Sequence, residues 1–213
     1  MGKRLLLIGG GGHCHSVLDS ILAMKSYEEI GIIDNIDNID NSYSGIPVIG
    51  TDDDVFKLYH CGWTDTVITV GSVGNTAVRR RLYQMAKKIG LFIPTIIDPS
   101  AIIARGTEIG EGTFIGKRAV VNAGTIINKC SIINTGAIVE HDCVLGSFSH
   151  ISPGTVLCGH VQIGADSHIG AGAVVKQQIS IGENVLIGAG SVVVKDIPDN
   201  VKAFGNPCRV VEK

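Results

Sequence analysis

The chain has 213 residues, a formal net charge of −2 and a sequence pI near 6.4. This charge balance gives no reason to expect a nucleic-acid partner or an anionic membrane surface, and no apolar stretch approaches the roughly 20 residues of a spanning helix. The six cysteines show no CxxC spacing, so we expect free thiols in a cytoplasmic protein.

The first part of the chain alternates between strand and helix patterns. Strands are expected over about 4–8, 30–33, 66–70 and 92–97, and helices over about 13–24, 52–59 and 75–88. The Asn- and Asp-rich segment 35–44 reads as a polar loop, and the arginines of the run 79–81 are expected to be solvated on their helix. Alternation of this kind is typical of a parallel α/β domain, which we place at residues 1–97 as a small Rossmann-like βαβ unit.

The second part of the chain repeats every six residues. An apolar residue stands at every sixth position from Ile103 to Val193, often followed by glycine, and a small or β-branched residue usually comes four places later. No amphipathic helix or ordinary strand keeps such a period, which is typical of a left-handed parallel β-helix built from one short strand and one corner per repeat. We therefore assign residues 98–213 to a β-helix with a C-terminal tail.

The run Gly9–Gly12 lies between the first expected strand and the first expected helix. Amides of such a turn, together with the helix N-terminus, can hold a phosphate. Asp34, at the end of the second strand, stands where an acid would bind a ribose hydroxyl. The dinucleotide pattern GxGxxG is not met because Cys14 occupies the third glycine position. A nucleotide or nucleotide sugar is favoured over NAD, with a purely structural turn as the alternative.

The histidines of the repeat region offer a second kind of chemistry. His141 stands two places after Val139, at an expected corner, between Glu140 and Asp142. A carboxylate bonded to one ring nitrogen fixes the tautomer and makes the other nitrogen a better base. If three repeats make one coil, residues 18 apart stack, so Gly159 would leave an open slot above His141.

A metal site is an alternative interpretation of these histidines. The same stacking places His150 beneath His168, and some β-helices carry zinc on histidines. A third ligand is not evident from the sequence, and no metal is expected.

Taken together, the chain resembles the bacterial hexapeptide acyltransferases that modify sugars, in particular the sialic acid O-acetyltransferase (NeuD-like) family with its nucleotide-sugar 4-amino N-acetyltransferases. Three blocks carry this resemblance, Ile8 to His13, Asn134 to Cys143 with His150, and Gly205-Asn206-Pro207. The family implies acetyl-CoA as co-substrate and a homotrimer with coenzyme A in the groove between neighbouring β-helices.

The resemblance also implies roles for individual residues. It makes His141 the general base and Asp142 the acid that supports it. The expected acetyl-CoA contacts are Asn134, His150, Gly159, Ala171 and Ala189, and the expected nucleotide-sugar contacts are Gly11, Gly12, His13, Asp34 and Asn35.

The implied reaction is acetyl transfer to the 4-amino group of a nucleotide-linked 4-amino-4,6-dideoxy sugar, without a covalent acyl-enzyme. Three alternatives remain: O-acetylation of a sialic acid or related sugar, a metal-dependent hydratase on the same β-helix, and a non-catalytic scaffold or nucleotide sensor. No membrane insertion is expected. The sequence leaves open whether the nucleotide is UDP or GDP and which glycan pathway uses the product.

Overall fold

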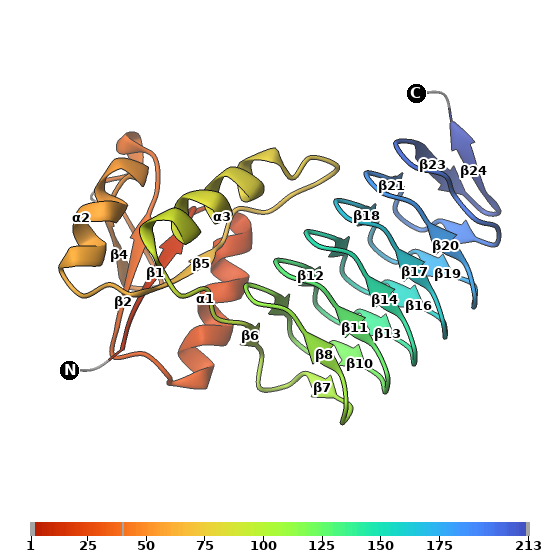
Figure 1. The fold of residues 1–213 in the computed structure, drawn as a ribbon, viewed down its shortest axis with the longest axis horizontal. Coiled ribbons are helices and arrows are strands. Elements are labelled where there is room, and N and C mark those ends of the chain that lie inside the picture. Colours follow the sequence, from red (N-terminus) through yellow and green to blue (C-terminus); the bar gives the residue numbers. More distant parts are fainter. Residues whose placement is uncertain (1–2, 40, 212–213) are drawn as a thin grey trace. The chain divides into compact units, whose positions relative to one another are not determined.

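The computed structural model describes residues 3–39 and 41–211, and the chain divides into two compact units. The first unit runs to Gly71 and includes Ala77–Ile96, whereas the second combines Ser72–Thr76 with the chain from Ile97 onward. The short segment Ser72–Thr76 is thus part of the C-terminal unit although it lies inside the N-terminal stretch of sequence. Figure 1 shows the order of the elements along the chain.

The N-terminal unit is built on a five-stranded sheet in the order β3-β4-β2-β1-β5. Its strands are β1 Arg4–Ile8, β2 Glu29–Ile33, β3 Ser42–Tyr43, β4 Ile46–Gly50 and β5 Asp65–Ile68, and its helices are α1 Gly12–Met24, α2 Val55–His60 and α3 Ala77–Ile89. Short 3₁₀ turns cover Ile36–Asn38 and Asp52–Asp54. All strand pairs are parallel except β3 with β4. The core strand β1 is buried from Leu5 to Ile8 because both of its neighbours are parallel strands.

Three local expectations need correction in this unit. The hairpin of β3 and β4 was missed, because Gly45 and Pro47 interrupt the apolar pattern. The strand expected over 92–97 is only a single bridge at Phe92 followed by β6, Ile96–Ile97. Arg79 is not solvated but 2% exposed, and its guanidinium donates to the carbonyl oxygens of Ile68 and Val70 at 3.1 and 2.6 Å.

The C-terminal unit is a parallel β-helix whose two-residue strands form three sheets. Sheet 1 contains β7 Ile102–Ile103, β10 Val120–Val121, β13 Ile138–Val139, β16 Val156–Leu157, β19 Val174–Val175 and β22 Val192–Val193. Sheet 2 contains β8 Glu108–Ile109, β11 Ile126–Ile127, β14 Val144–Leu145, β17 Gln162–Ile163 and β20 Ser180–Ile181. Sheet 3 contains β6 Ile96–Ile97, β9 Phe114–Ile115, β12 Ile132–Ile133, β15 His150–Ile151, β18 His168–Ile169, β21 Leu186–Ile187, β23 Lys202–Gly205 and the antiparallel β24 Cys208–Val211.

The register confirms that three repeats make one coil. Val139 pairs with Leu157 and His150 with His168, each 18 residues further along the chain. The second residue of each strand points inward, and from Ile115 to Val193 these side chains are at most 3% exposed. Cys143 fills a small interior position, as expected, and is fully buried. The hexapeptide period thus reflects one buried aliphatic side chain per strand.

The corners between sheets have a fixed backbone geometry. Several corner residues adopt a positive φ, and where the chain supplies no glycine there, the position is taken by residues such as Asp142 and His160, with φ of 59° and 58°. Asp and His are among the non-glycine residues that adopt this conformation most readily. Within residues 3–39 and 41–211, the helices are too short or too polar to cross a bilayer.

Candidate active site

The strongest candidate for a catalytic arrangement lies at the corner between sheet 1 and sheet 2, after β13. There His141 Nδ1–H donates to Asp142 Oδ2 at 2.8 Å, and about half of each side chain is exposed. This hydrogen bond holds the pKa of the Asp142 carboxyl below its usual value, and the charge of nearby His160 acts in the same direction. The Asp142 carboxylate therefore stays ionised at neutral pH and leaves Nε2 of His141 as the nitrogen with a free lone pair.

Gly159 provides the space beside this imidazole. A Cβ atom at position 159 would lie 2.6 Å from both Cε1 and Nε2 of His141, closer than real Cβ contacts allow. The carbonyl oxygen of Gly159 accepts from the Gln178 N–H at 3.0 Å, whereas within the described part of the chain its own N–H meets no acceptor. The slot expected from the 18-residue stacking is present, and it has a backbone donor at its edge.

Glu140, the other acid beside His141 in sequence, does not contact the imidazole. Its Oε2 accepts from Asn122 Nδ2 at 2.9 Å, one coil earlier. Glu140 is held by the neighbouring coil, so of the two flanking acids Asp142 is the one that bonds the ring. The sequence pattern alone did not separate the two carboxylates.

His150 lies on sheet 3 and is 8% exposed. Its Nδ1 is 2.8 Å from the carbonyl oxygen of Ser72, so Nδ1 carries the proton and Nε2 accepts from Asn134 Nδ2 at 3.2 Å. The ring stacks edge-to-face against His168, with centroids 4.7 Å apart. Burial lowers the pKa of His168. The stacking of His150 with His168 is therefore as expected, and two hydrogen bonds fix the orientation of the His150 ring.

Ala171 and Ala189 occupy the corner between sheet 3 and sheet 1, and both are exposed. They are stacked closely: the N–H of Gly190 donates to the Ala171 carbonyl at 2.8 Å, and a Cβ at Gly170 would lie 2.5 Å from the Ala189 nitrogen. Asn134 begins the same corner two coils earlier. The exposed surface of this corner therefore consists of backbone and small side chains, stacked from one coil to the next.

The expected acetyl-CoA and base residues thus fall into two groups within one chain. His141, Asp142 and Gly159 come together at the corner that follows sheet 1, whereas the other predicted cofactor contacts lie at or next to the corner that precedes it. The two groups occupy opposite edges of sheet 1, so a single chain does not assemble them into one site.

The glycine run of the N-terminal unit serves two purposes. Gly9 and Gly10 are required by packing, since a Cβ there would lie 2.5 Å from a Val70 methyl carbon and from Asp34 Oδ2, respectively. Gly11 is the N-cap of α1 and Gly12 its first residue, and a Cβ at either position would meet nothing within 4 Å. The open space at Gly11 and Gly12, with His13 in the first helical turn, suits the close approach of a ligand to the helix N-terminus.

A pocket of about 240 Å³ lies at the carboxyl ends of β1 and β2. Ile8, Ile33 and Val70 contribute apolar lining, and the polar side chains that line it are Asp34, Asn35, Asp52 and Arg81. Asp34 accepts hydrogen bonds from the Asn35 N–H and from Asn38 Nδ2, both at 2.9 Å, and Arg81 pairs with Asp52 at 3.0 Å. Asp34 and Asn35 were predicted from the sequence, whereas Asp52 and Arg81, which reach the pocket from a 3₁₀ turn and from α3, were not.

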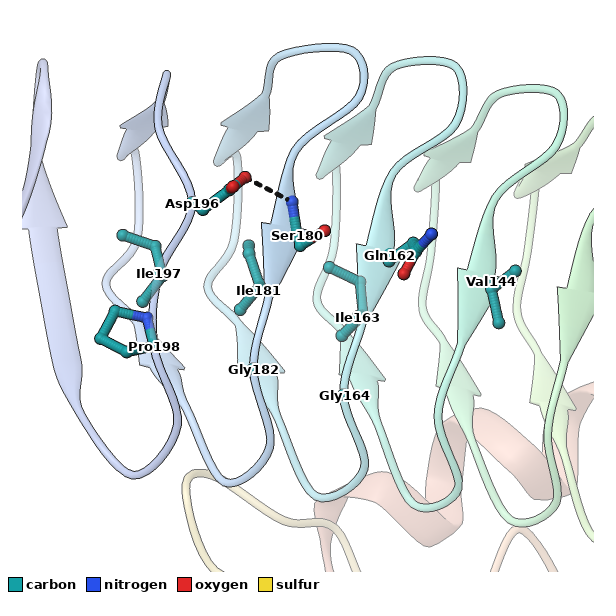
Figure 2. Close-up of a pocket in the computed structure, with 10 residues that line it drawn as sticks. All are labelled: Val144, Gln162, Ile163, Gly164, Ser180, Ile181, Gly182, Asp196, Ile197 and Pro198. Atoms are coloured by element: carbon teal, nitrogen blue, oxygen red, sulfur yellow. Dashed lines mark hydrogen bonds between the residues drawn. The ribbon is translucent and has the colours of Figure 1, made fainter.

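A larger pocket of about 500 Å³ lies on sheet 2 (Figure 2). Its lining runs from Val144 through Gln162 and Ser180 to the segment Asp196–Pro198, and Asp196 Oδ1 accepts from the Ser180 N–H at 2.8 Å. The lining contains no histidine, cysteine or cation, and none of the predicted site residues. Its size therefore does not make it the catalytic centre.

Comparison with known families assigns both units. Residues 4–86 match the PglD N-terminal domain, residues 142–177 and 160–195 match the bacterial transferase hexapeptide, and residues 106–139 match the hexapeptide repeat of succinyl-transferase. A segment is 36% identical over 121 residues to a UDP-N-acetylbacillosamine N-acetyltransferase from Bacillus subtilis. That match covers 53% of this chain and spans about half, 51%, of the relative's length.

Several solved structures match almost the whole chain, and two of them illustrate the similarity. The acetyltransferase domain of PglB from Neisseria gonorrhoeae FA1090 is 38% identical with a TM-score of 0.92, covering 98% of this chain and 100% of that one. PerB from Caulobacter crescentus, solved with CoA and GDP-perosamine, is 34% identical with a TM-score of 0.92, covering 99% and 98%. The PglB domain has also been solved with acetyl coenzyme A. The chain therefore belongs to the bacterial hexapeptide-repeat sugar acetyltransferases in which a PglD-type N-terminal domain precedes a left-handed β-helix.

Proposed function

We propose that this chain is an acetyl-CoA-dependent N-acetyltransferase that modifies the 4-amino group of a nucleotide-linked 4-amino-4,6-dideoxy sugar. The observation that carries the proposal is the His141–Asp142 pair beside the Gly159 slot. A structural corner needs neither an ionised acid on an exposed imidazole nor a glycine that keeps Nε2 accessible. Both features are what a general base for an incoming nucleophile requires.

In the proposed reaction the sugar amine attacks the carbonyl carbon of the acetyl thioester. His141 Nε2 takes the proton that the amine loses, while Asp142 stabilises the resulting imidazolium through Nδ1–H. The N–H of Gly159 faces the developing oxyanion, and the C–S bond then breaks to release coenzyme A as the thiolate, which takes up a proton. Acetyl passes directly between the substrates, so no enzyme nucleophile is required.

The nucleotide is assigned to the N-terminal unit. Gly11, Gly12 and His13 at the start of α1 offer amides and a helix N-terminus to the diphosphate. The nearby pocket offers hydrogen-bond acceptors and a cation to the ribose and base, from Asp34, Asn35, Asp52 and Arg81. Ligands in open α/β sheets bind outside the carboxyl ends of the strands, and this pocket lies there.

We further propose that the active enzyme is a homotrimer. The outward-facing residue of every strand in sheet 1 is aliphatic, namely Ile102, Val120, Ile138, Val156, Val174 and Val192, with Ile102 65% and Val174 37% exposed. Sheet 2 instead presents Glu108, Gln162 and Ser180 among its outward positions. An apolar face that runs the length of the β-helix is typical of a contact with another subunit.

The same assembly completes the site. If sheet 1 of each chain faces the three-fold axis, the His141 corner of one chain meets the Ala171 and Ala189 corner of its neighbour. The base and the predicted cofactor column, which lie on opposite edges of sheet 1 within one chain, then face each other across a subunit boundary. Acetyl-CoA would occupy that boundary.

The direct test is incubation with acetyl-CoA and a panel of UDP- and GDP-linked 4-amino sugars, with products read by mass spectrometry. An N-acetylated nucleotide sugar is expected from at least one member of the panel. If none reacts but a sialic acid is O-acetylated, the proposed amine substrate is wrong. If acetyl-CoA does not bind in calorimetry, the proposal of an acetyltransferase is wrong as a whole.

A further inference from the structure

His160 lies one coil above Asp142 and faces the same carboxylate as His141. The two positions are 18 residues apart and share the left-handed backbone conformation, so the coil repeat places one over the other. The His160 N–H also donates to the His141 carbonyl at 2.9 Å. The backbone therefore holds the three residues in fixed relation, independent of their side-chain rotamers.

The three side chains bring their ligand atoms close together. Asp142 Oδ2 is 2.8 Å from His141 Nδ1 and 3.4 Å from His160 Nε2, and one donor atom from each of the three residues lies within 4.8 Å of the others. The two rings meet edge-to-face with centroids 5.4 Å apart. Among the residues that the structure describes, this is the one group of three or more His, Cys, Asp or Glu side chains in such an arrangement.

We propose that His141, Asp142 and His160 form a binding site for a divalent transition-metal ion such as Zn²⁺, and that the bound ion inhibits the enzyme. Two imidazoles and a carboxylate are a donor set that zinc accepts. Zinc binds nitrogen and oxygen at about 2.0–2.2 Å, so tetrahedral ligand atoms lie about 3.3 Å apart. The separation of Asp142 from His160 already has about this value, and that of Asp142 from His141 must widen by about 0.5 Å. The two imidazole nitrogens, which lie within 4.8 Å of each other, must come to the same spacing.

The exposure of the cluster makes that adjustment possible. The side chains of His141, Asp142 and His160 are 53%, 49% and 57% exposed, so the ion can enter from solvent and the rings can turn. Three protein ligands leave a fourth position for water.

Inhibition of acetyl transfer by the bound ion rests on the proposed function of His141 as the base. It is expected because the imidazole ring has only one free lone pair. A neutral imidazole has one nitrogen with a free lone pair and one that carries a proton. If the ion binds Nδ1, the proton resides on Nε2, which then accepts nothing from the sugar amine. If the ion binds Nε2, that lone pair is occupied directly. Either mode removes the base.

The first measurement is zinc uptake by the full chain, stripped of metal with a chelator and dialysed against buffered Zn²⁺ without substrate. Wild type is expected to bind one ion per chain, and His160→Asn to bind it at least tenfold more weakly. Asn tolerates the left-handed conformation, so this variant keeps the corner intact. His60→Asn, an exposed histidine beside the exposed Cys61, is the matched control and should bind like wild type.

The second measurement is acetyl transfer with and without Zn²⁺. Wild type and His60→Asn should lose activity on adding zinc, whereas His160→Asn should be active without metal and resist inhibition at the same concentration. Absence of zinc uptake, equal uptake by His160→Asn, or uptake lost in His60→Asn instead would each overturn the metal site. Failure of the proposed function would be distinguishable, because wild type would then transfer no acetyl group even in the presence of a chelator.

Discussion

Replacing Gly159 by alanine tests the proposed catalytic role of the His141 corner through a single added methyl group. The new Cβ would lie 2.6 Å from Cε1 and Nε2 of His141 and 3.3 Å from Cδ2. Carbon atoms in contact prefer about 3.5–4.0 Å, so the ring edge must retreat by about 1 Å. A misplacement of about 1 Å in a catalytic group costs about 100-fold in rate, which corresponds to about 2.7 kcal/mol of transition-state stabilisation.

The fold should tolerate this substitution. Gly159 does not adopt a left-handed φ, so alanine introduces no backbone strain, and His141 is half-exposed and can turn into solvent. Replacing glycine by alanine reduces the conformational freedom of the unfolded chain, which stabilises the folded protein by about 0.4–1 kcal/mol where the native backbone conformation suits alanine. We therefore expect the melting temperature to stay the same or rise slightly.

The assay is steady-state release of coenzyme A thiol with the amino-sugar substrate identified from the panel. Gln177→Ala, an exposed residue one coil above Gly159, is the matched control and should retain turnover. Adding Gly159→Ala to a His141→Ala enzyme should have little further effect, because both changes act on the same imidazole. Turnover of Gly159→Ala within threefold of wild type would refute the assignment of this slot.

Four further outcomes are expected. His141→Ala should lower turnover by about 10²–10⁴-fold without changing the oligomeric state by light scattering, and unchanged turnover would remove His141 from the mechanism. Asp142→Asn should lower turnover by about tenfold. The fold lowers the pKa of Asp142, so the stability that its carboxylate contributes is present above the ordinary Asp pKa and is lost as pH falls through the lowered pKa. The melting temperature of the variant should therefore change less with pH in the acid range than that of wild type. Cys158→Ser should retain turnover, and loss of activity with an acetylated Cys158 in wild type would indicate an acyl-enzyme instead of direct transfer. Arg79→Met leaves the Ile68 and Val70 carbonyls without their donor and should destabilise the N-terminal unit by about 2–5 kcal/mol in urea unfolding, whereas a loss below about 1 kcal/mol would show that the buried guanidinium is dispensable.

The repeat period could be read from the sequence because it is a local property with a direct physical cause. Each strand of the β-helix buries one aliphatic side chain in a narrow interior, so the six-residue spacing of aliphatic residues recurs in every repeat. With three repeats to a coil, that spacing predicts the 18-residue stacking, and with it the contact of His150 with His168 and the slot of Gly159 above His141. Asp34 could be placed at the end of β2 for a similar reason, since a buried parallel strand ends where the polar residues begin.

Other features depend on which distant residues the fold brings together. The side-chain rotamers make Asp142, and not Glu140, the hydrogen-bond partner of His141. The stacking of coils places His160 beside the same Asp142 carboxylate. Arg79 is buried because the carbonyls at the end of β5 need a donor, although its sequence neighbours Arg80 and Arg81 suggest a solvated face. Asp52 and Arg81 reach the pocket at the carboxyl ends of β1 and β2 from separate elements. A short sequence motif records spacing along the chain, whereas hydrogen bonds and ion pairs depend on directions in space, and those are set only when the coils stack and the sheet forms.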